Sequence, residues 1–372
     1  MNQQLPTYKE KDYVRALVRA IESKHGSGRE WHIMEICGGQ THAIARYRLE
    51  ELLPPWVRLI HGPGCPVCVT SEATVARAIA IARRPEVIFA TFGDMMRVPG
   101  GDASLLSARA EGADVRMIYS PLDAVELARQ NPERQVVLFG IGFETTAPVH
   151  ALALIQAERL GLANFSFLSA LVTVPAAVES LMADPDCRID ALLAAGHVCA
   201  VTGYEAYHAL AARHRLPISV AGFEPVDILL GIGQCVGMLE SGRAEVMNAY
   251  PRMVSEQGNL RARADMERVF EPIDREWRGM GTIAQSGLTL REAYSSFDAE
   301  RRFADVDVHC DEARAALCRA GELLRGKLSP LDCPAFGTRC TPERPLGAAM
   351  VSSEGVCAAY HRYHSRTRQV SL

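Results

Sequence analysis

Two periods of apolar residues alternate along the chain, one typical of strands and the other of helices. Eight strand-length apolar runs begin near residues 31, 57, 87, 115, 136, 165, 190 and 218. Helical runs with one apolar face precede or separate them, for example 8–23, 71–83, 122–130 and 149–160. This regular alternation predicts an α/β fold whose parallel sheets are joined by right-handed crossovers.

The eight runs predict two Rossmann-like parallel-sheet domains of four strands each, 31–130 and 131–242, with Asn131-Pro132 as the break. A single eight-stranded barrel is the alternative. The strand pattern ends after residue 242, and 243–278, 289–297 and 311–324 are predicted to be helical. Residues 1–30 and 243–372 then form a third domain, mainly helical and loop-rich, whose last part needs a staple to fold.

Composition and charge exclude several classes of protein. Of the 372 residues, 48% are hydrophobic and 23% charged, as in ordinary globular proteins. The formal net charge is -4 and basic residues concentrate only in 361–368, so we expect no nucleic-acid partner. The N-terminus has no secretory pattern and no long apolar stretch occurs, so we expect no membrane span and a cytoplasmic location. Eleven cysteines in that reducing compartment indicate catalysis or metal binding.

Three cysteines lie within residues 35–68, where two strand-like runs end in Gly, Cys and His. Cys37 opens the first loop, and Cys65 and Cys68 form a C-x-x-C pair in the second. The positive end of a helix dipole acidifies a thiol, so we expect Cys65 to be the more acidic of the pair. Redox or soft-metal chemistry is favoured; half of a structural zinc site and a buried apolar pair are the alternatives.

A second group of cysteines lies in the Pro- and Gly-rich tail. Its members are separated by 14, 6 and 16 residues: Cys318, Cys333, Cys340 and Cys357. The wide, irregular spacing favours a [4Fe–4S] cluster over zinc, because zinc sites prefer two C-x-x-C knuckles. Buried free thiols are the third alternative. The isolated cysteines receive no role: Cys187, Cys199, Cys235 and Cys310.

Several loops that follow strand-like runs carry polar or charged side chains. The loops at the carboxyl ends of parallel strands meet at one edge of a sheet, so these residues are candidates for lining a cleft. They are Asp94, Arg97, Glu144, Thr145, Thr146, His197 and Glu224. Plainer explanations stay open, since residues 144–146 also suit ordinary helix capping and a lone histidine is more often structural. The glycines at 140–142 do not complete a phosphate-binding fingerprint.

Six motifs together make the chain resemble the HypD family of hydrogenase formation proteins over nearly its whole length. They are C-G-G-Q-T-H at 37–42, G-P-G-C-P-V-C at 62–68, F-G-D-M-M-R-V-P-G at 92–100, G-F-E-T-T-A-P at 142–148, G-H-V at 196–198 and the spaced cysteines of the tail. Two positions depart from the family pattern: Gln40 replaces a frequent histidine, and Cys199 replaces the usual serine. These departures leave no basis for a metal-binding role at residue 40 or a serine-specific role at residue 199.

The resemblance implies two Rossmann-like domains and a third that holds a [4Fe–4S] cluster on the four tail cysteines. It implies that Cys37 holds an iron carrying two cyanides and one carbon monoxide, shared with a cysteine of the chaperone HypC. It further implies that Cys65 and Cys68 are a redox-active pair between cluster and iron, and that HypE docks with a thiocyanate to deliver cyanide.

The chemistry of these parts is consistent with that expectation. Low-spin iron with cyanide and carbon monoxide is a soft centre that suits a thiolate. Releasing cyanide from a thiocyanate takes two electrons, which a dithiol supplies by becoming a disulfide. His42 is predicted to orient or deprotonate the Cys37 thiol, or to be purely structural. The alternative functions are an iron–sulfur-dependent thiol–disulfide reductase without an iron-carrying role, and a zinc-stapled interaction protein.

Overall fold

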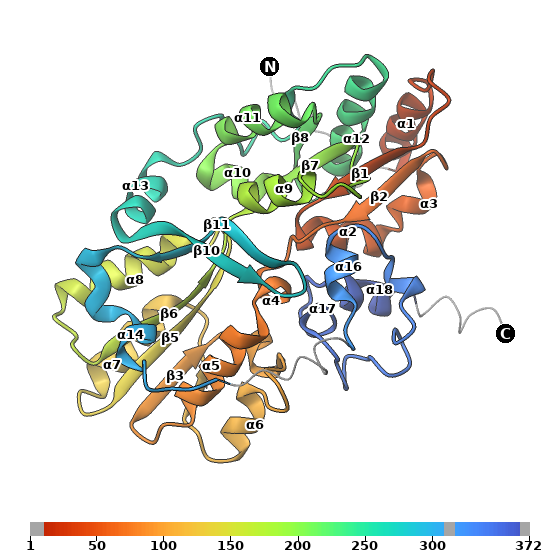
Figure 1. Ribbon diagram of the computed structural model, residues 1–372. Coiled ribbons are helices and arrows are strands. Elements are labelled where there is room, and N and C mark those ends of the chain that lie inside the picture. Colours follow the sequence, from red (N-terminus) through yellow and green to blue (C-terminus); the bar gives the residue numbers. More distant parts are fainter. Residues whose placement is uncertain (1–10, 309–316, 365–372) are drawn as a thin grey trace.

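The computed structural model describes residues 11–308 and 317–364 (Figure 1). All eight predicted strands are present, and they form two separate parallel sheets. The first sheet has the order β2-β1-β7-β8-β9. Its strands are β1 Trp31–Glu35, β2 Val57–His61, β7 Ala191–Ala195, β8 Ile218–Ala221 and β9 Val246–Asn248.

The second sheet has the order β4-β3-β5-β6, and its strands are also parallel. They are β3 Val87–Thr91, β4 Val115–Met117, β5 Gln135–Gly142 and β6 Phe165–Leu171. The strands of this sheet form near-continuous apolar runs, as expected for parallel strands covered by helices on both faces. The fold is therefore two open sheets and not the alternative eight-stranded barrel.

The strands do not pair in the order of the chain. Ile33 of β1 is paired with Ala191 of β7, and Val87 of β3 is paired with Gln135 of β5. Each sheet thus takes strands from both sides of Asn131, so the sheets do not follow the predicted division into 31–130 and 131–242. The apolar period identifies a strand but not its neighbour, because β1 has two edges on which a partner can pair.

Helices cover both faces of each sheet. Those around the first sheet are α1 Lys11–Glu22, α2 Gly38–Tyr47, α3 Leu49–Leu52, α9 Val174–Met182, α10 Gly196–Thr202, α11 Glu205–His214 and α12 Pro225–Glu240. Those around the second are α5 Glu72–Ala82, α6 Leu105–Ala110, α7 Pro121–Gln130, α8 Ala147–Arg159 and the 3-10 helix η1 Gly93–Arg97. The predicted helices at 71–83, 122–130 and 149–160 are confirmed; Ser71 caps α5 by accepting from the Thr74 amide at 3.2 Å.

The segment after residue 242 is less helical than predicted. It contains strand β9, helix α13 Leu260–Val269, and an antiparallel hairpin of β10 Phe270–Trp277 and β11 Gly281–Leu290. Of the helix predicted over 243–278, only α13 is helical. The prediction is wrong at β10, which exposes a charged middle and buries only its ends, because this hides the strand period. The prediction at 289–297 is replaced by the 3-10 helix η2 Glu292–Phe297.

The hairpin lies between the two sheets and ties them together (Figure 1). Ser169 of β6 donates to the Leu288 carbonyl at 2.6 Å, and the Thr173 amide donates to the Ser286 carbonyl at 2.8 Å. Trp277 is fully buried and bridges to Thr70, which directly follows α4 Pro66–Val69. The hairpin therefore fixes the segment of the C-x-x-C motif.

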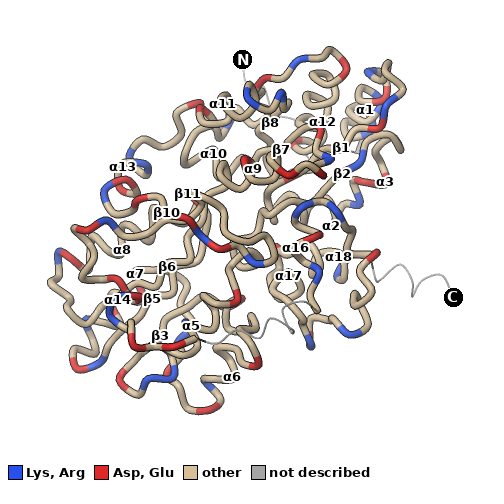
Figure 2. The backbone as a smooth tube through the Cα atoms, in the orientation of Figure 1, with Lys and Arg blue, Asp and Glu red and all other residues tan. Residues whose placement is uncertain are grey.

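The C-terminal segment packs on α2 and α4 (Figure 1). Its described elements are α16 Ala320–Leu324, the 3-10 helix η3 Pro330–Asp332, α17 Ala348–Val351 and α18 Val356–His364. Helix α14 Ala299–Arg302, earlier in the chain, packs on β6 of the second sheet. The predicted helix at 311–324 and the basic run 361–368 lie partly outside the described residues. Within the described ranges, no helix is long and apolar enough to cross a membrane. Charges of both signs are interspersed along the chain (Figure 2).

Candidate functional site

Cys37 lies where β1 ends and α2 begins, at the N-cap of α2. Two loops meet there: the Gly38 amide donates to the Gly64 carbonyl at 2.9 Å. A Cβ at Gly64 would lie 2.2 Å from the Cys37 nitrogen, so only glycine allows the two backbones to approach this closely. Gly38 of C-G-G-Q-T-H and Gly64 of G-P-G-C-P-V-C thus allow the loops that carry Cys37 and Cys65 to pack closely together.

The partner of the Cys37 sulfur is His197, at the start of α10 and after β7. The sulfur lies 3.5 Å from His197 Nδ1. Burial raises the pKa of the Cys37 thiol well above its ordinary value, and the charge of Glu35 adds to this effect. Burial lowers the pKa of His197 to about 4, so its imidazole is neutral. A protonated thiol therefore faces a neutral imidazole that can accept its proton.

Two other polar residues of the C-G-G-Q-T-H motif point elsewhere. His42 Nε2 lies 3.1 Å from the Tyr363 hydroxyl on α18, and the two rings form an edge-to-face pair. The Gln40 amide nitrogen donates to the carbonyls of Ala221 at 2.9 Å and Gly222 at 3.3 Å. The imidazole beside Cys37 is thus that of His197 instead of His42, while Gln40 ties α2 to the end of β8.

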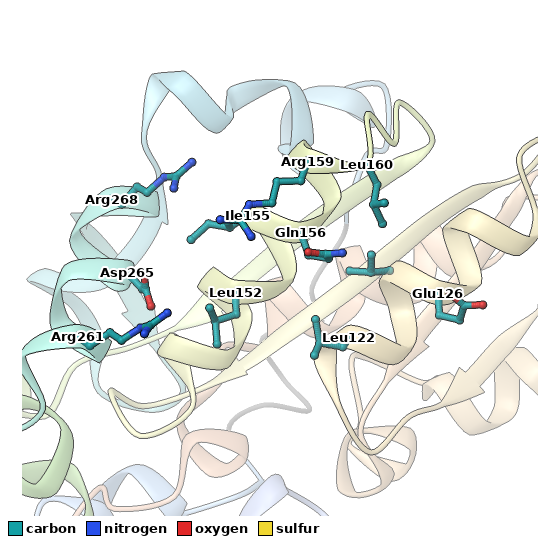
Figure 3. A pocket seen from close by; sticks show the side chains of 11 residues that line it. Leu122, Glu126, Leu152, Ile155, Gln156, Arg159, Leu160, Arg261, Asp265 and Arg268 are labelled. Carbon is teal, nitrogen blue, oxygen red and sulfur yellow. The ribbon is translucent and has the colours of Figure 1, made fainter.

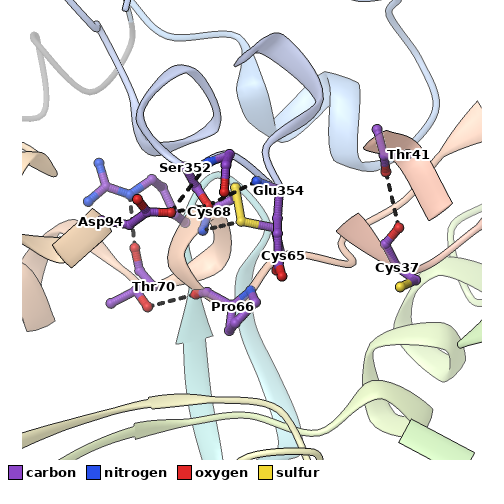
Figure 4. Close-up of a disulfide and its surroundings, with 11 residues drawn as sticks. Cys37, Thr41, Cys65, Pro66, Cys68, Thr70, Asp94, Ser352 and Glu354 are labelled. Atoms are coloured by element: carbon purple, nitrogen blue, oxygen red, sulfur yellow. Dashed lines mark hydrogen bonds between the residues drawn. A yellow bond between two sulfur atoms is a disulfide. The ribbon is translucent and has the colours of Figure 1, made fainter. Parts of the chain in front are cut away.

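Cys65 and Cys68 form a disulfide at the N-terminus of the short helix α4 (Figure 4). Cys65 is the N-cap, and its sulfur accepts from the Cys68 amide at 3.1 Å. Both residues are buried. The pair lies between β2 of the first sheet and β3 of the second. Because sulfurs in a disulfide do not titrate, the greater acidity of the Cys65 thiol stays a prediction.

The disulfide shares a buried cluster with the tail cysteines. Cys340 and Cys357 belong to this cluster, and Cys318 packs against it. The Cys340 sulfur accepts from the Leu346 amide at 3.4 Å, and the next residue, Gly347, lies against the Cys318 sulfur. The C-x-x-C motif and the tail cysteines, remote in sequence, thus meet in space.

The four tail thiols lie within electrostatic range of one another. Burial raises the pKa of Cys357 well above its ordinary value, and negative charge on each of the other three thiols would raise it further. A group that neutralises four thiolates would remove this repulsion, which is what a [4Fe–4S] cluster does when four cysteines ligate its corners. In the part of the chain that the structure describes, no group of three or more His, Cys, Asp or Glu side chains is arranged to hold a single metal ion.

The loops that carry Cys37 and the disulfide touch through their backbones, but the side chains of Cys37 and of the disulfide pack in different clusters. Gly64, next to Cys65, touches the Cys37 backbone, whereas the Cys37 side chain packs in the core of the first sheet. In Figure 4, Cys37 lies apart from the disulfide. The disulfide thus shares a buried cluster with the tail cysteines, and the loop that contains Gly64 joins it to Cys37.

The F-G-D-M-M-R-V-P-G motif holds the C-terminal segment over the disulfide (Figure 4). Asp94 accepts from the Ser352 hydroxyl at 2.9 Å and from the Ser353 amide at 3.3 Å. Arg97 donates to the Val351 carbonyl at 3.1 Å. Asp94 and Arg97 were predicted to line a cleft, and the structure shows them holding residues 351–353, before α18, by hydrogen bonds.

The remaining strand-end candidates make hydrogen bonds within their own loops or to neighbouring backbone, or are partly buried. One oxygen of Glu144 accepts from the Val174 amide at 2.9 Å, and the other is buried without a hydrogen-bond partner. Burial raises the pKa of Glu144 to about 7. Thr146 donates to the Phe143 carbonyl at 3.3 Å in the turn before α8, whereas Thr145 and Glu224 are partly buried. Among the strand-end candidates, His197 is placed beside the Cys37 sulfur.

Sequence reasoning missed a buried hydrogen-bonded chain behind Cys37. Glu35 is fully buried; it accepts from the Cys37 amide at 2.8 Å and lies 2.7 Å from His61 Nδ1. His61 Nε2 lies 2.8 Å from the Tyr360 hydroxyl, 299 residues further along the chain. The sequence signal for this chain of hydrogen bonds was that Glu35 and His61 end two strand-like runs. Nothing in the sequence pointed to Tyr360 as their partner.

A groove of about 470 Å³ lies between α7, α8 and α13 (Figure 3). Leucines and arginines line it, including Leu122, Leu152, Arg159 and Arg261. It contains no cysteine and none of the residues predicted for the site. We therefore place the candidate site at the thiols and not in this groove.

Fold and site together define a two-sheet α/β protein with a buried thiol–imidazole pair and a disulfide that shares a buried cluster with cysteines of the C-terminal segment. The HypD family profile, described as "Hydrogenase formation hypA family", matches residues 12–364. The chain is 51% identical to the hydrogenase maturation factor HypD of Rhodobacter capsulatus, covering 89% of each chain. It is 49% identical to that of Azotobacter vinelandii over 95% of each, and 47% identical to that of Escherichia coli over 94% of this chain and 93% of the relative. The chain belongs to the HypD family.

Proposed function

We propose that this chain is a hydrogenase maturation factor that serves as the scaffold on which an Fe(CN)2CO unit is assembled. The observation that carries the proposal is the Cys37 thiol held 3.5 Å from a neutral imidazole nitrogen of His197. Family membership supports the biological setting. In this proposal, Cys37 binds the iron of the cargo, and HypC supplies a second thiolate.

Iron binding requires that Cys37 lose its proton, which burial opposes in the free protein. The soft iron centre favours thiolate over harder ligands and offsets that cost. His197 Nδ1 is the acceptor within reach of the departing proton. Once protonated, the imidazolium would stabilise the neighbouring negative charge, so His197 assists loading without binding the metal.

Cyanide transfer needs a two-electron reductant. A thiocyanate R–S–C≡N takes up two electrons and yields R–S⁻ and cyanide. In the proposed step the thiocyanate is carried by HypE, and the Cys65 and Cys68 thiols release two electrons and two protons as they become a disulfide. The proximity of the two sulfurs, which lets them form a disulfide, supports this step.

The tail cysteines complete the proposal. Cys318, Cys333, Cys340 and Cys357 would hold a [4Fe–4S] cluster, which supplies single electrons when bound. Supporting this, Cys340 and Cys357 share one buried cluster with Cys65 and Cys68. HypC and HypE are the proposed partners, and the cytoplasm is the proposed location, where a dithiol is kept reduced between turnovers.

The decisive experiment compares Cys37→Ala with Cys235→Ala in protein purified together with HypC. Cys235 is also fully buried, so its replacement controls for loss of a core thiol. We expect cyanide and carbonyl infrared bands in the wild type and in Cys235→Ala, and none in Cys37→Ala. Bands that survive in Cys37→Ala would refute Cys37 as the iron ligand.

A second candidate function is an iron–sulfur-dependent thiol–disulfide reductase that carries no iron cargo. The burial of the disulfide in one cluster with Cys340 and Cys357 favours this candidate as much as the first. Infrared bands on the HypC complex distinguish the two, because the reductase predicts none. Iron and zinc analysis of the wild type and of Cys340→Ala tests the cluster: we expect iron in the wild type and its loss, with the visible absorption, in the variant. A zinc-containing colourless wild type would reject it.

A further inference from the structure

A buried carboxylate holds the loop that carries Cys37. Glu35 Oε2 accepts from the Cys37 amide at 2.8 Å. Glu35 Oε1 lies 2.7 Å from His61 Nδ1 and also accepts from the Thr41 hydroxyl on α2. A single side chain, without solvent exposure, thus fixes the backbone of Cys37 and the first turn of the helix that follows it.

Counting protons along the chain of hydrogen bonds assigns a charge to His61. The Tyr360 hydroxyl donates its one proton to Glu50 Oε2 at 2.8 Å, so it accepts from His61 Nε2 at 2.8 Å. The Nδ1 proton of the same ring goes to Glu35, and both nitrogens are therefore donors. Burial alone would lower the pKa of His61, but the nearby carboxyl groups of Glu35 and Glu50 outweigh it and raise the pKa to about 9. His61 is an imidazolium between two carboxylates.

Tyr360 brings this chain onto the helix of a tail cysteine. It lies three residues after Cys357 on α18, so the two side chains are on the same side of the helix. Tyr363, one turn further, makes a separate contact with His42 on α2 at 3.1 Å. Helix α18 is therefore fastened to the Cys37 region by two hydroxyls, and only that of Tyr360 leads to Glu35.

We propose that Tyr360 and His61 are positioning residues for Cys37, through which the seating of α18 sets the reactivity of the Cys37 thiol. The inference deepens the proposed function, in which Cys37 binds iron and Cys357 is a tail ligand, but the coupling itself needs no iron. Without the Tyr360 hydroxyl, the buried His61 Nε2–H and the Glu50 carboxylate each lose a partner. Glu35 then loses its fixed cationic neighbour, and with it the restraint on the Cys37 amide.

The test measures alkylation of individual cysteines by iodoacetamide in the purified full-length protein, with residue-resolved mass spectrometry and no added iron. Tyr360→Phe is compared with Tyr363→Phe, which removes a hydroxyl from the same helix without touching the chain to Glu35. We expect Cys37 in Tyr360→Phe to react about tenfold faster than in the wild type, the factor for about 1.4 kcal/mol. Cys37 in Tyr363→Phe should keep the wild-type rate.

A second variant guards against unfolding. His61→Gln removes the charge and the two ring nitrogens that donate in different directions to Glu35 and Tyr360, so it should raise the Cys37 rate like Tyr360→Phe. Cys235 is fully buried on α12 and reports general loosening. Equal Cys37 rates in Tyr360→Phe and Tyr363→Phe, or a matching rise at Cys235 in either network variant, would overturn the proposal. Because no iron is involved, this result is independent of whether Cys37→Ala loses the infrared bands.

Discussion

The sulfur of Cys37 lies 3.5 Å from Nδ1 of His197, although 160 residues separate them in the chain. Cys37 follows β1 and His197 follows β7, and these strands are neighbours in the first sheet. Both lie at the carboxyl ends of parallel strands, where open α/β sheets place their reactive groups. The pair consists of a protonated thiol and a neutral acceptor, which is the arrangement needed to release one proton when a metal binds.

Replacing His197 removes the acceptor of the Cys37 proton. We expect the alkylation rate of Cys37 at pH 8 to fall about tenfold in His197→Phe, since one hydrogen bond that favours proton loss disappears. His42→Phe is the matched control, because His42 contacts Tyr363 and not Cys37. Slowing of Cys37 in His42→Phe with a normal rate in His197→Phe would reverse the assignment.

His61 predicts a pH dependence of stability with a definite sign. Its folded-state pKa of about 9 lies above the ordinary value of 6.5, so its contribution is complete below pH 6.5 and is lost as the pH rises through 9. Urea unfolding at pH 6 and pH 9.5 should show the wild type losing up to about 3 kcal/mol more than His61→Gln. Parallel losses in the two proteins would show that His61 is not the titrating group.

Asp94 predicts how readily the disulfide is reached. Asp94→Ala removes the acceptor for Ser352 and Ser353 and so frees the segment that covers Cys65 and Cys68. We expect dithiothreitol to reduce the disulfide about tenfold faster in this variant. Asp123→Ala serves as control, since Asp123 caps α7 away from the thiols. An unchanged reduction rate in Asp94→Ala would mean that the segment does not limit access.

Gly64 predicts a steric limit at the meeting of the two loops. An alanine Cβ would lie 2.2 Å from the backbone nitrogen of Cys37. A backbone atom cannot move away by changing a side-chain rotamer, so the two loops would have to separate. We expect Gly64→Ala to lower the free energy of unfolding by about 2 kcal/mol or more. Gly237→Ala, on α12, meets only the end of Lys24 at 3.4 Å and should be neutral or stabilising by about 1 kcal/mol. Urea unfolding of both variants tests the contrast.

Several features of the fold follow from local patterns. The eight strands and the helices over 71–83, 122–130 and 149–160 were predictable because apolar period, caps and prolines act over a few residues. Strand order was not, since β1 can pair on either edge. The β10–β11 hairpin escaped prediction because its exposed charges resemble a polar helix.

The site was predictable in part for the same reason. Cys37, the C-x-x-C pair and the tail cysteines stand out by residue type and spacing, and their motifs carry the family resemblance. The assignment of a histidine to Cys37 could not be made from proximity in sequence. His42 is five residues away but lies on α2 facing α18, whereas His197 arrives from a neighbouring strand.

The amino-acid sequence by itself determined the eight strands before residue 242 and the helices between them, which residues are thiols, and the family resemblance. Only the tertiary structure decided that His197 faces Cys37, that Asp94 latches the tail, and that Glu35, His61 and Tyr360 form one buried chain. The physical reason is range. Backbone propensities and caps depend on neighbours in the chain, whereas these contacts exist only after sheets and helices from distant segments have packed and excluded water.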